Sequence, residues 1–193
     1  KFWILSQDKI NLDNKIKFFK THHARCNIHN NSFTNSKNTL ATIYIVRDPR
    51  DVLISFAKHF SQTVEESKNR MIDRYSFTYS ELENIEDALH VILGTWADNY
   101  NSWIKDNKNA LLIKYEDLIN NKKDELLKII EFINKFTKLN PDNKKINNCI
   151  KTTSFENMKT MEEKGLFNEN KINKKTLKKI KFFNKGKNKN WIK

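Results

Sequence analysis

Glycine, proline and cysteine are scarce in this sequence of 193 residues, which contains three glycines, two prolines and two cysteines. So few chain breakers leave no flexible linker, and no internal repeat is visible, so one domain covering residues 1–193 is expected. Cys26 and Cys149 lie far apart in the sequence and form no disulfide framework, which favours a reducing, cytoplasmic compartment. No apolar run approaches the length of about 18–20 residues that crosses a bilayer, so no membrane span is expected.

Acidic side chains are also in short supply. The 36 lysines and arginines outnumber the 23 aspartates and glutamates, which gives a formal net charge of +13. A positive field of this size attracts anionic ligands, such as phosphorylated small molecules or nucleic acids. Lysine and asparagine are spread along the whole chain, and no basic stripe interleaved with aromatic residues accompanies them. The composition therefore favours a small anionic ligand, and nucleic-acid binding is the weaker alternative.

Three short apolar segments predict the strands of a β-sheet. They cover residues 15–20, 42–47 and 110–115, and each is rich in β-branched, aromatic or other apolar residues and bounded by polar ones. Predicted helices lie between and after the last two of these segments. Strands that alternate with helices are typical of an α/β fold, in which a parallel sheet is flanked by helices.

Three segments have the spacing of amphipathic helices. Residues 89–105 and 126–136 each place their apolar side chains on one helical face. Residues 52–60 follow Asp48 and Pro49, which suit the N-cap and the first position of a helix. The sequence therefore predicts a helix directly after the second strand.

Polar and charged residues follow each predicted strand. Residues 20–22 are Lys-Thr-His, Arg47 ends the second strand, and residues 115–117 are Tyr-Glu-Asp. Open parallel sheets bind their ligands beyond the carboxyl ends of the strands. These three strand ends are therefore expected to meet at one site.

Arg47 and Ser55 are candidates for binding one phosphate group. The guanidinium of Arg47 has a planar set of donors that matches phosphate oxygens, and Ser55, eight residues later, adds a hydroxyl from the following helix. The simpler interpretation is that Arg47 forms an ion pair with Asp48 or Asp51 and that Ser55 is an ordinary helix residue. Taken alone, this short stretch favours the simpler interpretation.

Five stretches, in the same order along the chain, resemble motifs of the cytosolic-type sulfotransferases. Each is weak alone, but together they extend over most of the chain. The resemblance implies a P-loop-NTPase-like parallel sheet flanked by helices, with 3′-phosphoadenosine 5′-phosphosulfate (PAPS) as the sulfuryl donor and 3′-phosphoadenosine 5′-phosphate (PAP) as the product. The stretches are FKTHHA (residues 19–24), IVRDPRDVLISF (45–56), LLIKYEDL (111–118), TTSFENMK (152–159) and FFNKGKNKNW (182–191).

The resemblance also implies a set of nucleotide-binding residues. Aromatic faces stack on a base, and lysines or backbone amides near glycine bind phosphate oxygens, so the residue types suit these roles. The alternative for the aromatic members is that they belong to the core. The implied set consists of Arg47 and Ser55 at the 3′-phosphate, Lys185 and Gly186 closing over it, Tyr115, Thr153 and Phe155 at the adenine, and Ser154 beside them.

The catalytic residues implied by the resemblance are His22 and Lys20. Histidine suits a general base because its ordinary pKa lies near neutrality, and lysine balances the negative charge that develops during transfer. A zinc site built from His22, His23, Cys26 and His29 is the rival interpretation. It is disfavoured because no second ligand cluster accompanies this one, so no metal is expected.

Several features depart from the family pattern. The Pro-Lys-Ser/Thr-Gly-Thr-Thr run that binds the 5′-phosphosulfate is absent from these residues, and Asn184 and Asn190 replace the usual Arg and Asp. An incomplete N-terminus is the favoured explanation. The alternative is a non-catalytic module on the same fold that binds PAP or another protein.

The acceptor is not specified by the sequence. Residues 61–86 are polar, aromatic and weakly periodic, and they are expected to form a variable lid over the acceptor site. Small molecules, carbohydrates, lipids and peptides all remain open as acceptors, and so does the formation of a homodimer.

Overall fold

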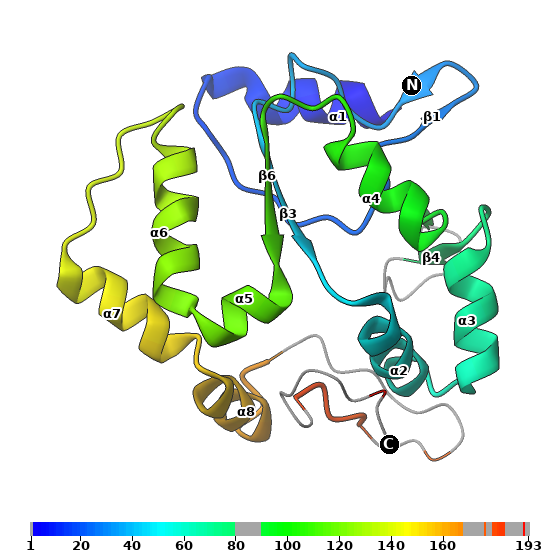
Figure 1. Ribbon diagram of the computed structural model, residues 1–193. Coiled ribbons are helices and arrows are strands. Elements are labelled where there is room, and N and C mark those ends of the chain that lie inside the picture. The colour runs from blue at the N-terminus through cyan, green and yellow to red at the C-terminus, as the bar shows by residue number, and fades with distance from the viewer. Residues whose placement is uncertain (1, 80–89, 168–175, 177–178, 184–190, 192–193) are drawn as a thin grey trace. The chain divides into compact units, whose positions relative to one another are not determined.

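The computed structural model describes residues 2–79, 90–167, 176, 179–183 and 191 (Figure 1). The chain divides into two compact units, each formed by two separate parts of the sequence. The first unit comprises Lys1–Tyr44 and Asn69–Leu112, and the second comprises Ile45–Lys68 and Ile113–Lys193. The single domain that the composition predicts over residues 1–193 stays a prediction.

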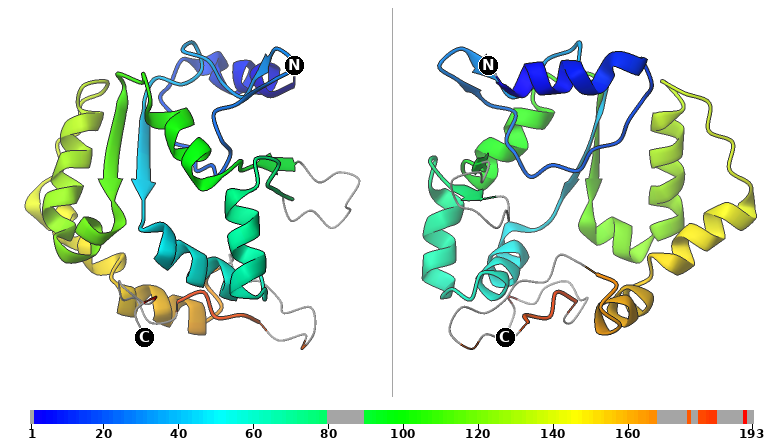
Figure 2. Two further views of the ribbon diagram at one scale, coloured as in Figure 1. Left: turned by 45° about the vertical axis from the view of Figure 1, so that its right-hand side comes forward. Right: turned by 180° about the vertical axis from the view of Figure 1, so that it is seen from behind.

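A small parallel sheet is formed by β3 (Thr42–Val46) and β6 (Ala110–Lys114), which lie side by side in Figures 1 and 2. Both strands were predicted from their apolar residues, and the mixed α/β class is confirmed. Each strand runs from the first unit into the second, so the carboxyl ends of both strands belong to the second unit. The finer expectation of a P-loop-NTPase-like sheet stays a prediction.

The first unit combines short helices with two small hairpins. Strands β1 and β2 pair in an antiparallel manner, and so do β4 and β5. Its buried core contains Ala24 and Trp103. Besides the first parts of β3 and β6, the unit contains α1 (Phe2–Ile10), the 3-10 helix η1 (Asn11–Asp13), β1 (Asn27–Ile28), β2 (Asn31–Ser32), β4 (Phe77–Tyr79), β5 (His90–Ile92) and α4 (Trp96–Ile104).

The second unit is mainly helical. Helix α2 begins as the sequence predicts, because the Asp48 carboxylate accepts a hydrogen bond from the Arg50 N–H and Pro49 is the first helical residue. Its core includes Ile113, which is 1% exposed, and Phe132. The helices are α2 (Pro49–His59), α5 (Tyr115–Asn120), α6 (Lys122–Ile133), α7 (Asn143–Thr152) and α8 (Phe155–Glu163), and α3 (Val64–Ile72) runs from this unit into the first.

Two expectations about secondary structure are wrong. Residues 15–20 form no strand, and the side chains of Phe18 and Phe19 are 70% and 69% exposed. An apolar run becomes a strand only where a neighbour pairs with its backbone, and none of the described strands does so here. The helix predicted over residues 89–105 begins only at Trp96. Residues 90–92 form β5 instead, and Gly94, with a φ of +66°, has a backbone conformation that does not belong to a right-handed helix.

The segment expected to cover an acceptor, residues 61–86, is partly described. It contains α3 and β4, and residues 80–86 lie outside the described part of the chain. Its role over an acceptor stays a prediction. Within the described residues, no helix has both the length and the apolar composition needed to cross a membrane.

Candidate functional site

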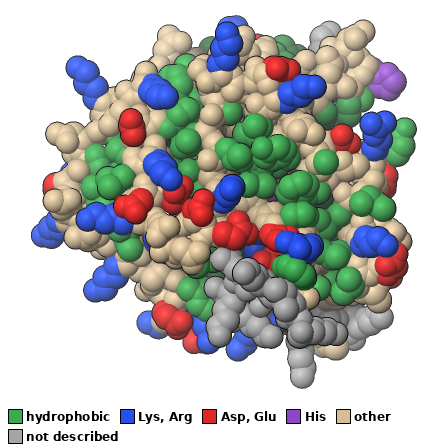
Figure 3. All heavy atoms as spheres, in the orientation of Figure 1, with side chains coloured by type: hydrophobic (Ala, Val, Ile, Leu, Met, Phe, Trp, Pro, Cys, Tyr) green, Lys and Arg blue, Asp and Glu red, His purple; other side chains and the backbone are tan. Residues whose placement is uncertain are grey.

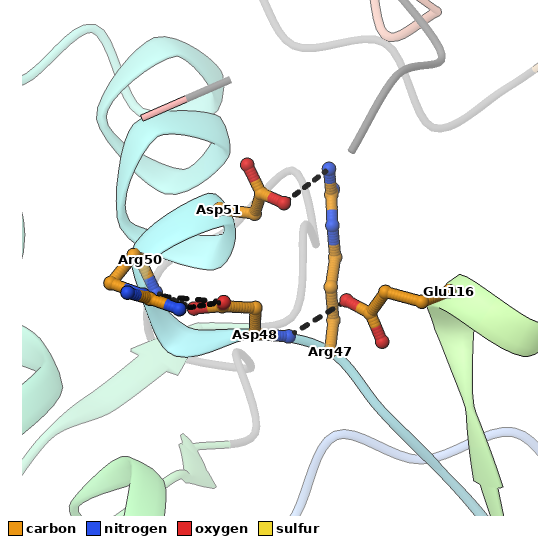
Figure 4. Close-up of polar contacts among 5 residues, drawn as sticks. All are labelled: Arg47, Asp48, Arg50, Asp51 and Glu116. Carbon is orange, nitrogen blue, oxygen red and sulfur yellow. Dashed lines mark hydrogen bonds and ion pairs between the residues drawn. The ribbon is translucent and has the colours of Figure 1, made fainter. Parts of the chain in front are cut away.

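The turn between β3 and α2 carries the central residue of the candidate site, Arg47. The next residue, Asp48, caps α2 with its carboxylate and donates its backbone N–H to Oε1 of Glu116 at 3.0 Å (Figure 4). Glu116 lies in the first turn of α5, directly after β6. The ends of the two parallel strands are therefore joined by a hydrogen bond next to Arg47.

The guanidinium of Arg47 lies between an aromatic ring and a buried carboxylate. Its central carbon is 4.5 Å from the centroid of the Tyr115 ring, and its Nη2 is 4.0 Å from Oδ2 of Asp51. The side chain of Arg47 is 21% exposed, and that of Asp51 is 1% exposed. The ion pair of Arg47 with Asp51 that the sequence allowed is thus present, and together with Tyr115 it fixes the direction of the guanidinium.

Arg50 is bound differently from Arg47. Its Nε donates to Oδ1 of Asp48 at 2.9 Å, its Nη2 donates to Oδ2 at 2.6 Å, and its guanidinium lies 3.7 Å from the centroid of the Trp191 ring. Hydrogen bonding from Arg50 lowers the pKa of Asp48 below its ordinary value and raises that of Arg50. The two arginines of the Arg-Asp-Pro-Arg turn therefore lie against different aromatic rings, Tyr115 and Trp191, which their spacing in the sequence does not reveal.

The predicted contacts of the adenosine lie at helix ends of the second unit. The Thr153 hydroxyl donates to the backbone oxygen of Cys149 at 2.7 Å, and Ser154 caps α8 by accepting from the Asn157 N–H at 3.3 Å. Phe155 opens α8, and its ring centroid is 6.0 Å from that of Phe183.

Among the predicted nucleotide-binding residues, Arg47 and Tyr115 are in direct contact. Ser55 is exposed on α2. Lys185 and Gly186 lie outside the described residues.

An aromatic cluster in the second unit went unnoticed in the sequence. The ring of Phe182 is 5.0 Å from that of Phe167 and 5.8 Å from that of His59. The carboxylate of Glu162, which is 8% exposed, accepts the backbone N–H groups of Phe182 at 2.5 Å and of Phe183 at 3.0 Å. In the sequence, the adjacent Phe182 and Phe183 are the signal for this cluster. No sequence pattern marks Glu162 as the buried acceptor.

The two predicted catalytic residues belong to the first unit. Lys20 and His22 are exposed and lie in a segment without helix or strand. The backbone oxygen of His22 accepts from Nδ2 of Asn99 at 3.3 Å, and that of His23 accepts from Nε1 of Trp103 at 2.9 Å. Two side chains of α4 thus hold the backbone of this segment through hydrogen bonds, and His22 remains exposed.

His23 has the opposite environment to His22. It is 4% exposed, its ring stacks on Phe33 at 4.2 Å, and its Nδ1–H donates to the Ala24 oxygen at 2.8 Å. Burial lowers the pKa of His23, so the neutral form is favoured. No group of three or more His, Cys, Asp or Glu residues in the described part of the chain is placed to hold a metal ion.

Charge on the visible face is mixed. In Figure 3, basic side chains lie among acidic and hydrophobic ones. This distribution agrees with the interpretation of much of the positive charge as dispersed.

A family model for the sulfotransferase domain matches residues 5–193. The chain belongs to the sulfotransferase family. Relatives include the 3-alpha-hydroxysteroid sulfotransferase of Cavia porcellus, which is 29% identical over 144 residues, and the amine sulfotransferase of Oryctolagus cuniculus, which is 27% identical over 124 residues. These matches cover 74% and 63% of this chain and 46% and 38% of the relatives. The chain therefore spans less than half the length of these two relatives.

The fold of this chain resembles that of a solved structure, mouse sulfotransferase SULT7A1 complexed with PAP. The TM-score is 0.53 at 22% sequence identity, and the match covers 79% of this chain and 52% of the other. The family resemblance expected from the five motifs is confirmed. The roles of the individual site residues stay predictions.

Proposed function

We propose that this protein transfers a sulfuryl group from PAPS to a hydroxyl or amine acceptor and releases PAP. Family membership supports the reaction class. The observation that carries the proposal for this chain is the position of Arg47, a mostly buried cation directly after a parallel strand, with its guanidinium against Tyr115. An oriented arginine at the end of a parallel strand suits recognition of a phosphate group.

The 3′-phosphate of the nucleotide is the proposed ligand of Arg47. Asp51 forms an ion pair with Nη2 of the guanidinium, and the remaining charged donors of Arg47 match the phosphate oxygens. Ser55, Lys185 and Gly186 are the proposed additional phosphate contacts. The adenosine is proposed to meet Tyr115, together with Thr153, Ser154 and Phe155.

His22 is the proposed general base. The acceptor oxygen forms a bond to sulfur while the bond between sulfur and the bridging phosphate oxygen breaks, and the acceptor proton passes to the His22 imidazole. PAP leaves with the electron pair of the broken bond. Lys20 is proposed to balance the negative charge on the transferring group, because such transfers depend on positioning and cations more than on covalent intermediates.

Small organic alcohols and amines are the first acceptors to test. Two relatives are named as a hydroxysteroid and an amine sulfotransferase, and this suggests an apolar molecule with one such group. Carbohydrate, lipid and peptide acceptors follow in the screen. The proposed chemistry uses no metal ion.

Calorimetric titration tests the nucleotide site. We expect the wild-type chain to bind PAP more tightly than adenosine 5′-phosphosulfate, which lacks the 3′-phosphate. Arg47→Ala is expected to weaken PAP binding by roughly 10- to 100-fold, because hydrogen bonds to charged groups contribute about 1.5–3 kcal/mol. Arg74→Ala is the matched control, since that side chain is 80% exposed and belongs to the first unit. Equal PAP affinity in wild type and Arg47→Ala would contradict the proposed phosphate site.

A non-catalytic PAP-binding module is the second candidate. The contact of Arg47 with Tyr115 supports nucleotide binding alone, and it is therefore compatible with this module. This module would bind PAP as above but would transfer no sulfuryl group from PAPS to any acceptor in the screen. Transfer that disappears in His22→Ala, with PAP binding unchanged, would exclude it.

A further inference from the structure

The stack of Trp191 on Arg50 connects the last described residue of the chain to the beginning of α2. The guanidinium lies 3.7 Å from the centroid of the indole ring, which is the geometry of a close cation–π contact. The Arg50 side chain is 59% exposed, so without specific partners it would adopt many orientations. Two partners restrict it instead, with Asp48 at the edge of the guanidinium and Trp191 at its face.

Asp48 links this stack to Arg47. Its carboxylate accepts from the backbone N–H, Nε and Nη2 of Arg50, and its own N–H donates to Glu116. Both ends of Asp48 are therefore held, and Asp48 is the residue that directly follows Arg47 (Figure 4). A change that releases Arg50 loosens one of these attachments and, with it, the backbone from which the Arg47 guanidinium extends.

We propose that Trp191 is a positioning residue for the anion site at Arg47, acting through its stack on Arg50 and the ion pair of Arg50 with Asp48. This inference rests on the proposed binding of the 3′-phosphate by Arg47. Arg50 is assigned a positioning role, because its Nε and Nη2 donate to Asp48 and one face of its guanidinium lies on Trp191. The proposal requires arginine at position 50, because its planar guanidinium stacks on Trp191 while it binds the Asp48 carboxylate. Lysine keeps the charge but has no planar group that could do both.

Titration with PAP and with 5′-AMP, which lacks the 3′-phosphate, tests the proposal on the full chain. We expect Trp191→Ala and Arg50→Lys each to weaken PAP binding by about two- to fivefold, in proportion to one cation–π contact. Binding of 5′-AMP should change much less, so the ratio of the two affinities falls. Trp191→Phe keeps an aromatic face and should retain most of the wild-type ratio. A merely structural role would weaken both nucleotides equally.

Trp96 supplies the matched control. It lies in the first unit and stacks on Tyr100 at 6.0 Å, so Trp96→Phe removes an indole without changing the Arg50 stack. Circular dichroism and thermal melting establish that each variant is folded. Unchanged PAP affinity and an unchanged ratio in Trp191→Ala and Arg50→Lys would overturn the proposal.

Fluorine NMR of protein labelled with 5-fluorotryptophan separates this inference from the proposed function. The Trp191 resonance is assigned as the one lost in Trp191→Phe, and it should shift in Arg50→Lys whether or not nucleotide is present. Absence of that shift would overturn the stack in solution. Absence of PAP binding by the wild type, with the shift present, would instead overturn the proposed function and the positioning role that depends on it.

Discussion

The contrast between His22 and His23 leads to a prediction about stability and pH. Although the two histidines are adjacent in the sequence, His23 is 4% exposed whereas His22 is exposed. The Nε2 atom of His23 is buried and has no hydrogen-bond partner among the residues that the structure describes. Protonation would add a charge at this atom without any compensating acceptor there, which agrees with the lowered pKa of His23.

The cost of removing the His23 side chain follows from its contacts. The ring stacks on Phe33 at 4.2 Å and meets the edge of Trp3 at 4.8 Å. His23→Ala is expected to lower the free energy of unfolding by about 3 kcal/mol, near the lower end of the range for a buried aromatic ring. His23→Phe keeps the ring and loses one hydrogen bond, worth about 1 kcal/mol. The Ala24 oxygen that accepts this bond also accepts from the Cys26 N–H at 2.8 Å, so it remains paired.

The direction of the pH effect follows from the lowered pKa. The unfolded chain protonates His23 near the ordinary histidine pKa of about 6.5, whereas the folded chain does so only at lower pH. The contribution of His23 to stability is therefore complete above about pH 6.5 and is lost as the pH falls from there toward the folded-state pKa. His23→Phe should lack this loss.

Urea unfolding between about pH 7.5 and about pH 5.5, followed by circular dichroism, measures the effect. Wild type and the control His22→Gln should lose stability more steeply with acid than His23→Phe. Carboxylates titrate mainly below this window, so they contribute little to the difference. Equal pH slopes in wild type and His23→Phe would refute the reasoning.

Three further predictions concern the second unit. Ile113→Ala should lower the free energy of unfolding by about 2–5 kcal/mol in urea titrations, because removal of this 1%-exposed side chain creates a cavity. Ile113→Val should lower the same free energy by about 1 kcal/mol. Glu162→Gln should cost about 1–3 kcal/mol by the same method, since an amide offers one acceptor oxygen to the N–H groups of Phe182 and Phe183. Tyr115→Leu should weaken PAP binding in calorimetry, and Tyr115→Phe should not, because the ring rather than the hydroxyl contacts Arg47. Equal effects of the two substitutions at position 115 would contradict that assignment.

The sequence predicts local structure well where the signal is local. Asp48 and Pro49 mark the beginning of α2 because a capping carboxylate and a fixed φ act within one turn. The two strands of the parallel sheet are predicted for a similar reason, as each is a short run of apolar residues between polar ones. The segment at residues 15–20 has the same pattern and forms no strand, since pairing depends on a neighbour that the pattern cannot specify.

The candidate site divides in the same way. Family motifs in the sequence identify Arg47 and Tyr115, but their contact depends on where β3 and β6 end, and this is decided by the packing of the sheet. Asp51, Glu116 and Trp191 also lie in these motifs, but the sequence leaves Asp51 as one of two possible partners of Arg47 and gives no partner for Glu116 or Trp191. The contacts of Glu116 and Trp191 arise because residues distant in sequence meet at one turn.

The sequence by itself determined the family, the class of fold and the beginning of α2, because these depend on the order of motifs and on interactions within a few residues. Tertiary structure alone decided that Arg47 lies against Tyr115 while Arg50 stacks on Trp191, and that His23 is buried beside an exposed His22. Adjacent residues of one type have the same intrinsic chemistry. Burial and partners, which come from distant parts of the chain, make them different.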